Sequence, residues 1–328
     1  MNNRSEVPGD SDSVVGADSS RLARFLQFFL LCAGSLILLV AVALLLYWPI
    51  AVIVLLIAVV CLPGVLTMPS MLQMARANRH DSVRIPSFGE FLAAWWSESV
   101  AVAKVYLWRQ SFGWHRRTDS RSPSACSESA SGSAIVFVHG FVCNRGLWNP
   151  WMARLDQLGV PYVSVNLEPL FGSISDYAAI IESAVRKAQQ LAPGKPLLVG
   201  HSMGGLASRA WLLTHTGANQ RVCAVVTIGS PHRGTLLANG SKTTNGRQMM
   251  VGSRWLAELE QQERQQRPSG TYQQFLCWYT NTDNIVFPAS TALLEGADNR
   301  MIPGIGHLAL NYHSRVMQET IALARSTE

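Results

Sequence analysis

A long apolar run near the start is the most prominent pattern in the chain. From Phe25 to Leu66 the sequence has no charged residue, and its clearly polar side chains are Gln27 and Ser35. One continuous helix of this length would measure about 63 Å, twice the ~30 Å hydrocarbon core of a bilayer. The run therefore predicts a two-helix transmembrane hairpin over residues 25–66. A cleaved signal peptide does not fit, because its apolar region has only about 7–15 residues.

The turn of the hairpin is predicted at Tyr47, Trp48 and Pro49. Proline disfavours continuation of a helix, and Tyr and Trp prefer the headgroup level of a bilayer. We therefore expect helices near residues 25–46 and 50–66. A single long signal anchor stays an alternative.

Arginine residues flank both ends of the apolar run. Because cytoplasmic loops carry an excess of Lys and Arg, we expect both ends in the cytoplasm. The hairpin would then lie in a bacterial inner membrane, with the rest of the chain on the cytoplasmic side, and residues 1–24 would form a disordered tail. The arginines are Arg21 and Arg24 before the run and Arg76, Arg79 and Arg84 after it.

Residues 67–133 connect the hairpin to the rest of the chain. Between residues 86 and 115, aromatic and aliphatic side chains are interspersed with charged ones, which predicts a juxtamembrane amphipathic helix. Two alternatives stay open for this helix: it lies in the membrane interface with Trp side chains at the headgroups, or it packs on the following domain. Residues 115–133 are rich in Ser and Arg without apolar periodicity, which is typical of a linker.

Short apolar runs alternate with helical stretches over residues 134–328. This alternation predicts a mostly parallel sheet of six strands with helices on both faces. In such sheets the loops at the carboxyl ends of the strands carry the chemistry. Strands are predicted at residues 134–138, 162–165, 196–199, 222–228, 275–279 and 300–302, and helices at 148–158, 176–191, 204–214 and 308–324.

The strongest local motif is Gly200-His201-Ser202-Met203-Gly204. It follows a buried-type strand and precedes a helical stretch, which is the setting of a nucleophile elbow. The glycines let the backbone turn sharply and leave space around a strained serine. We predict that Ser202 is a nucleophile and that His201 points elsewhere; the alternative is an ordinary turn that contains a serine.

A serine hydroxyl needs an adjacent base to accept its proton, and in this architecture the acid and then the histidine follow the serine in the chain. His307, on a glycine-rich loop after the last strand, is the predicted base; the alternative is a hydrogen-bonded loop histidine. His232 precedes every later acid, and His313 lies inside the terminal helical pattern.

Asp283 is the predicted acid, because it follows the strand at residues 275–279 and so lies at a carboxyl end. Asp298 and Glu295 precede a strand instead, which places them at the wrong end of the sheet.

Acyl transfer also needs two donors aimed at the developing oxyanion. The backbone N–H of Met203, after the nucleophile, is one candidate. The backbone N–H of Phe141, where the first strand ends in a glycine turn, is the other. His139 is expected to stabilise that loop rather than to take part in catalysis.

Together these segments resemble bacterial α/β-hydrolase-fold lipases and esterases over residues 134–324. The resemblance implies an acyl-enzyme formed through a Ser-His-Asp triad, with no cofactor and no metal. The chain departs from secreted lipases in its amino-terminal hairpin, and its core begins at the strand that bears the oxyanion turn. The matching segments are Val138-His139-Gly140-Phe141, Gly200-His201-Ser202-Met203-Gly204-Gly205, Ile228-Gly229-Ser230-Pro231-His232-Arg233-Gly234, Asp283 and Gly306-His307.

Residues 235–271 form an insertion with a helical stretch at 247–266. In similar lipases an insertion after this strand forms a lid. A plain surface helix is the alternative.

Composition adds further constraints. The chain is 48% hydrophobic and 15% charged, whereas soluble proteins carry about a quarter charged residues. Its formal charge of +6 is spread along the chain without a dense basic stripe, so we expect no nucleic-acid partner. The six cysteines are scattered without a CxxC pair, which predicts buried, reduced thiols.

The sequence thus predicts a membrane-anchored serine hydrolase that cleaves carboxylic esters, with a lipid or another acyl ester as substrate and the membrane as partner. An acyltransferase or thioesterase would use the same residues. From a different class, a non-catalytic membrane-bound protein would keep the hydrolase fold for binding.

Overall fold

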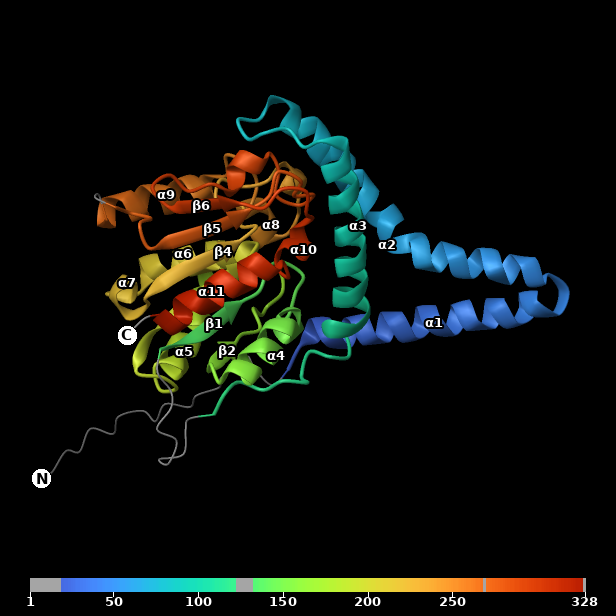
Figure 1. Cartoon of the computed structure of the whole chain (residues 1–328), viewed down its shortest axis with the longest axis horizontal. Helices are drawn as coiled ribbons and strands as arrows, with labels where there is room; N and C mark the ends of the chain where they lie inside the picture. Colours follow the sequence, from blue (N-terminus) through green and yellow to red (C-terminus); the bar gives the residue numbers. More distant parts are fainter. Residues whose placement is uncertain (1–18, 122–131, 268–269, 327–328) are drawn as a thin grey trace, which may run out of the picture.

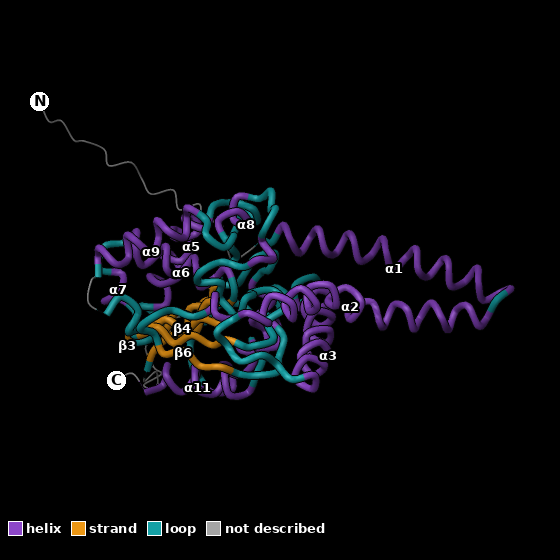
Figure 2. The backbone as a smooth tube through the Cα atoms, turned by 90° about the horizontal axis from the view of Figure 1, so that it is seen from above, coloured by secondary structure: helices purple, strands orange, loops and turns teal. Residues whose placement is uncertain are grey.

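The computed structural model describes residues 19–121, 132–267 and 270–326. Figures 1 and 2 show an α/β domain from which a hairpin of two long helices projects at one end. Residues 1–18, which include most of the predicted tail, and residues 122–131 of the predicted linker lie outside the described part.

The domain is built on a six-stranded sheet in the order β2-β1-β3-β4-β5-β6, in which every neighbouring pair is parallel. This confirms the predicted parallel sheet, and the predicted strands differ from the observed ones by at most two residues at either end. The strands are β1 (Ser133–Val138), β2 (Tyr162–Ser164), β3 (Gly194–His201), β4 (Ala224–Ile228), β5 (Phe275–Tyr279) and β6 (Asp298–Met301).

Helices cover both faces of the sheet, as predicted (Figure 2). Alternate residues of β1 point to opposite faces: Val136 belongs to one buried apolar cluster, and Ile135 and Phe137 belong to the other. The first cluster includes side chains of α5 (Ala178–Ala188) and α6 (Met203–Thr214), and the second includes side chains of α4 (Asn149–Leu158) and α11 (Ser314–Ser326). The shorter helix α7 (Ala218–Arg221) follows α6, and α8 (Thr244–Gln248) and α9 (Arg254–Gln266) follow β4.

The terminal helix predicted over residues 308–324 is two helices in the structure. The short α10 (His307–Leu310) ends before Asn311, and α11 begins at Ser314. The carbonyl oxygen of Asn311 accepts the indole N–H of Trp151 at 2.8 Å, and the Tyr312 hydroxyl donates to the carbonyl oxygen of Leu147 at 2.9 Å. These contacts with the α4 region hold the chain in a break between the two helices.

The hairpin consists of α1 (Arg21–Tyr47) and α2 (Pro49–Ala77), which are antiparallel neighbours joined at Trp48 (Figure 1). Both helices are long and apolar enough to cross a membrane, by length and composition. The turn lies where it was predicted, but α1 begins four residues earlier than expected and α2 continues eleven residues further. Large apolar side chains are exposed along both helices, among them Phe28, Leu39, Ile50, Ile57 and Val60.

Helix α2 continues to Ala77 through two internal prolines, Pro63 and Pro69, although proline disfavours a helix interior. The Thr67 hydroxyl bonds the carbonyl oxygens of Pro63 and Gly64 at 3.0 and 3.1 Å, and the Trp95 indole donates to the Gly64 carbonyl at 2.9 Å. These bonds give the carbonyl groups near the prolines additional partners. The last part of α2 runs alongside the next helix (Figure 1).

The predicted amphipathic helix is α3 (Phe88–Lys104), which begins with a capping box between Ser87 and Glu90. One face, with Ala94, Glu98 and Ala101, is buried against α2 and the α/β domain. Of the two alternatives for this helix, packing on the domain is therefore the observed one. The opposite face nevertheless exposes three large apolar side chains, those of Phe88, Leu92 and Trp96.

The cysteine thiols differ in exposure. Cys143 and Cys277 are buried, as expected, whereas Cys32 and Cys61 are exposed on the hairpin. Cys223 is partly buried, and Cys126 lies outside the described residues.

Candidate active site

Ser202 lies in a strained turn between β3 and α6. Its φ of 55° falls in the left-handed region, where non-glycine residues are uncommon. The turn needs its glycines: a Cβ on Gly200 would lie 2.7 Å from the Gly205 nitrogen, and one on Gly204 would lie 2.2 Å from the Val138 oxygen. The sequence motif therefore has the backbone geometry of a nucleophile elbow.

The loop after β1 approaches this serine closely. A Cβ on Gly140, the residue before Phe141, would lie 2.8 Å from the Ser202 Cβ, so the glycine turn packs directly against Ser202. Val142 has a φ of 50°, which shows that this turn is strained as well. Within the described residues the backbone N–H groups of Phe141 and Met203 donate no hydrogen bond, so both are available to an oxyanion.

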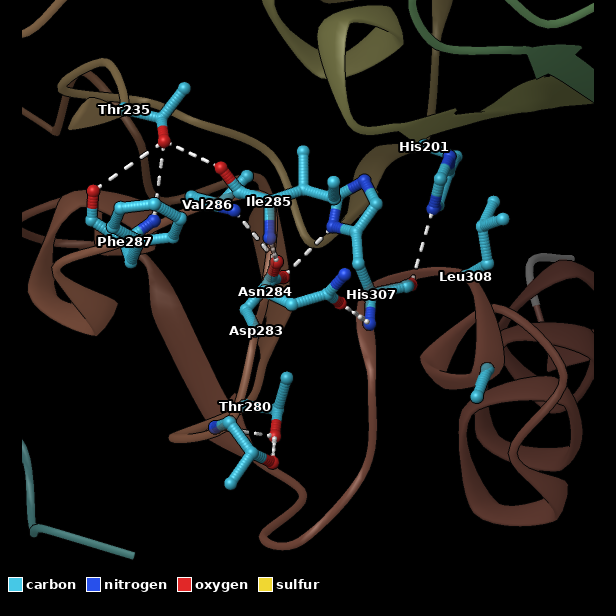
Figure 3. Close-up of polar contacts among 12 residues, drawn as sticks. His201, Thr235, Thr280, Asp283, Asn284, Ile285, Val286, Phe287, His307 and Leu308 are labelled. Carbon is cyan, nitrogen blue, oxygen red and sulfur yellow. Dashed lines mark hydrogen bonds and ion pairs between the residues drawn. The ribbon is translucent and has the colours of Figure 1, made fainter. Parts of the chain in front are cut away.

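Asp283 and His307 form a buried pair at the carboxyl end of the sheet (Figure 3). Their Oδ2 and Nδ1 atoms are 2.9 Å apart. The other carboxylate oxygen, Oδ1, accepts the backbone N–H groups of Ile285 and Val286 at 2.9 and 2.7 Å. Asp283 is thus fixed by its own loop, and it orients the ring so that Nε2 of His307 is the free nitrogen.

Gly229, directly after β4, lies between these groups. A Cβ there would be 3.1 Å from Nδ1 of His307 and 3.2 Å from Oδ2 of Asp283. The preceding carbonyl, of Ile228, accepts the N–H of Ser202 at 2.9 Å. The serine turn and the Asp–His pair therefore meet at the end of β4. Within the described residues Ser202 Oγ makes no hydrogen bond to His307.

Two opposing effects act on the pKa of His307. Burial lowers it, but the charge of Asp283, the hydrogen bond to Asp283 and the charge of Glu98 together raise the pKa above its ordinary value of 6.5. A histidine with this environment is stabilised in its imidazolium form, which is the form that a general base reaches after it has accepted a proton.

The other histidines have structural contacts. His201 Nε2 lies 3.4 Å from the His307 carbonyl oxygen (Figure 3), and burial holds the pKa of His201 well below its usual range. His139 accepts the Leu167 N–H at 2.9 Å and bonds the neighbouring Gly140 oxygen at 2.9 Å, which fits the expected loop-stabilising role.

The other candidate base and the other candidate acids have contacts outside the Asp–His pair. His232 is buried, with Nε2 3.0 Å from the Thr227 hydroxyl. Asp298 is the first residue of β6, and it pairs with Arg300. Glu295 is an exposed partner of Arg264.

Two groups that contact the histidine loop were not predicted from the sequence. Glu98 of α3 accepts the N–H groups of Leu308 and Ala309 at 2.8 and 3.1 Å. Asn284 accepts the N–H of His307 at 3.3 Å and donates to the Ser70 hydroxyl of α2 at 3.2 Å. A single glutamate in a Trp-rich helix gives no sequence signal for such a contact.

Helix α9, within the predicted insertion, is fixed to the domain by a buried ion pair. Arg209 of α6 and Glu263 of α9 are 2.6 Å apart, and the Tyr272 hydroxyl donates to the same carboxylate at 2.8 Å. Breaking a buried pair costs about 3–5 kcal/mol. This contact holds α9 against α6 in the structure, and the lid over residues 235–271 stays a prediction.

Comparisons with known proteins bear on the fold that carries these residues. A family model described as "PGAP1-like alpha/beta domain" matches residues 170–295. The crystal structure of mature Bacillus licheniformis lipase BlEst2 is similar, with 19% identity and a TM-score of 0.51, over 62% of this chain and 96% of that lipase. None of the curated proteins compared with the chain matches it.

Aspergillus fumigatus lipase B is similar at 14% identity and the same TM-score of 0.51, over 63% of this chain and 56% of that lipase. The chain therefore spans little more than half the length of the fungal protein. At this level of identity the likeness concerns the fold. The protein has the α/β-hydrolase fold, preceded by a hairpin of two apolar helices.

Proposed function

We propose that this protein is a membrane-anchored serine hydrolase that cleaves carboxylic esters of lipids or other acyl compounds. The observation that carries the proposal is the Asp283–His307 hydrogen bond, which meets the strained Ser202 turn at the end of the sheet. The fold supports an ester substrate, since both similar structures described above are lipases by name.

In this mechanism Ser202 Oγ attacks the ester carbonyl while Nε2 of His307 accepts its proton. Asp283 holds Nδ1–H and stabilises the imidazolium, which then protonates the leaving alcohol. The N–H groups of Phe141 and Met203 stabilise the oxyanion. Water then attacks the acyl-enzyme by the same steps and releases the acyl group as a carboxylic acid. The bond between Ser202 and His307 forms when substrate binds, because catalytic hydrogen bonds often tighten only in that complex.

Membrane anchoring is supported by contacts at both ends of the hairpin. The Arg21 N–H donates to Glu168 at 2.8 Å, and Asn78, directly after α2, donates to the Asn281 carbonyl at 2.9 Å. Because both ends contact the same domain, both lie on one side of the bilayer with it. The arginine bias favours the cytoplasmic side.

Helix α3 crosses the base of the hairpin, between it and the α/β domain (Figure 1). A bilayer that contains α1 and α2 would meet the exposed Phe88, Leu92 and Trp96 side chains. The other face of α3 contacts the histidine loop through Glu98. In this arrangement α3 lies between the lipid surface and the histidine loop.

The proposal is tested by hydrolysis of p-nitrophenyl esters of increasing chain length in detergent. We expect turnover by the wild-type protein and none above background by Ser202→Ala. Ser230→Ala is the matched control, because this buried hydroxyl has no hydrogen-bond partner among the described residues. Equal turnover by wild-type protein and Ser202→Ala would contradict the mechanism.

The same assay separates hydrolysis from acyl transfer. With a primary alcohol added in excess, a hydrolase releases mainly free acid, whereas an acyltransferase forms mainly the new ester.

Reporter fusions after Arg84 and after Glu328 test the topology. Cytoplasmic reporter activity at both positions is expected, and periplasmic activity at both would contradict the hairpin orientation.

A further inference from the structure

A carboxylate from the juxtamembrane helix lies against the backbone of the histidine loop. The Glu98 side chain is 1% exposed, and its Oε2 accepts the N–H groups of Leu308 and Ala309 at 2.8 and 3.1 Å. On the other side of His307, a Cβ on Gly306 would lie 2.4 Å from the Glu98 Cβ. Glu98 thus contacts the loop both before and after His307.

Glu98 forms no ion pair with a Lys or Arg among the described residues. The titratable groups that face it are His307 and Asp283 on the two loops and Tyr106 on the continuation of its own helix. The His201 ring lies beside that of His307, with the two centroids 4.7 Å apart and the ring planes tilted by 52°. Burial raises the pKa of Glu98 to about 7, although the charge of His307 lowers it. A buried carboxylate without a Lys or Arg partner is costly.

Hydrogen bonding at this position does not require a charge, because a neutral glutamine side chain would accept the same two backbone hydrogen bonds. A role limited to holding the loop does not require a carboxylate. The charge does, however, act on His307: it is among the causes that raise the pKa of that imidazole.

We propose that Glu98 is a positioning residue that fixes the backbone on both sides of His307 and acts on that imidazole through its negative charge. Asp283 acts on the ring at Nδ1, and Glu98 acts from α3. The expected effect of Glu98 on kcat rests on the proposed function, whereas its expected effect on the pKa of His307 does not.

The direct test is an NMR titration of His307 in histidine-labelled, full-length protein in detergent micelles, with the signal assigned by His307→Gln. Glu98→Gln keeps the hydrogen-bond acceptor and removes the charge, so the pKa of His307 should fall. Glu258→Gln is the matched control, since it removes an exposed carboxylate of α9, and it should leave the pKa unchanged. An unchanged pKa in Glu98→Gln would overturn the proposal.

Kinetics on an ester substrate separate the charge from the backbone contact. Glu98→Gln should lower kcat about tenfold with KM unchanged, because the charge acts on the imidazolium formed in the transition state. Glu98→Ala should lower kcat further, because the backbone N–H groups of Leu308 and Ala309 then lack an acceptor. Wild-type kcat and pH profile in Glu98→Gln would show a purely structural role and contradict the proposal.

If Glu98→Ala does not fold, Glu98→Gln still decides the question. Absence of ester hydrolysis by the wild-type protein would defeat the proposed function. The His307 titration would then still test Glu98 independently.

Discussion

Asn78, directly after α2, donates a hydrogen bond from Nδ2 to the carbonyl oxygen of Asn281 over 2.9 Å. Its Oδ1 accepts the backbone N–H of Ala289 at 3.1 Å. Asp283 lies between Asn281 and Ala289, so one buried amide connects the hairpin to both ends of the loop that carries the predicted acid. The hairpin is therefore part of the framework that orients the Asp–His pair.

Asn78→Ala is expected to destabilise the protein by about 1–3 kcal/mol, because two buried backbone groups lose their partner. It should also lower kcat, since the loop of Asp283 loses a support at each end. Thermal unfolding in detergent and ester hydrolysis measure the two effects. Asn239→Ala, at an exposed position, is the control. Wild-type stability in Asn78→Ala would show that the bridge does not hold the loop.

The assignment of the acid predicts a clear ranking of two substitutions. Asp283→Asn removes the carboxylate that orients His307 and should lower kcat by about four orders of magnitude. Asp298→Asn removes only a partner of Arg300 at the start of β6 and should leave kcat nearly unchanged. Steady-state kinetics of the two purified variants test the ranking. The reverse order would identify Asp298 as the acid.

The environment of His307 predicts how activity depends on pH. A general base must be neutral before it can accept a proton. Burial alone would lower the pKa of His307, but Asp283 and Glu98 outweigh it and raise the pKa above 6.5. We therefore expect kcat/KM to rise with pH, with a midpoint above 6.5. A profile in which kcat/KM falls across this range would contradict His307 as the base.

The raised pKa of His307 affects the free energy of unfolding in the opposite direction from activity. Because the folded state holds the proton of His307 more tightly than the unfolded state, this group contributes stability below pH 6.5 and loses it as the pH rises through the folded pKa. Activity and this contribution to stability are thus expected to change in opposite directions.

The exposed face of α3 predicts a dependence on the form of the substrate. Replacing Phe88, Leu92 and Trp96 together by serine removes apolar contact with a lipid surface. Hydrolysis of esters presented in vesicles should decrease, while hydrolysis of a short, water-soluble ester by the same variant should stay at the wild-type rate. An equal decrease in the hydrolysis of both substrates would show that these three side chains stabilise the fold and do not act through lipid contact.

The sheet and the candidate triad were predictable because their signals are local. Each segment predicted as a strand overlaps a strand of the sheet, and Ser202, Asp283 and His307 each follow a strand in the chain. Parallel strands bring their carboxyl ends to one edge, so residues far apart in sequence come together without any further signal.

The contacts of α2 and α3 with this site were not predictable, because they join residues more than 200 positions apart. Asn78 pairs with Asn281, and Glu98 pairs with Leu308, by hydrogen bonds to backbone atoms. Such bonds place no constraint on the partner's residue type. The end of α2 was predicted too early because the apolar run ends at Leu66, whereas the helix continues to Ala77 beside α3.

The central claim is that Ser202 is the nucleophile, and covalent labelling tests it most directly. The full-length protein in detergent is treated with a fluorophosphonate, digested, and the modified residue located by mass spectrometry. We expect one phosphonyl adduct, on Ser202, which is absent in Ser202→Ala and strongly reduced in His307→Gln. An adduct on a different residue, or labelling of Ser202→Ala at the wild-type rate, would contradict it.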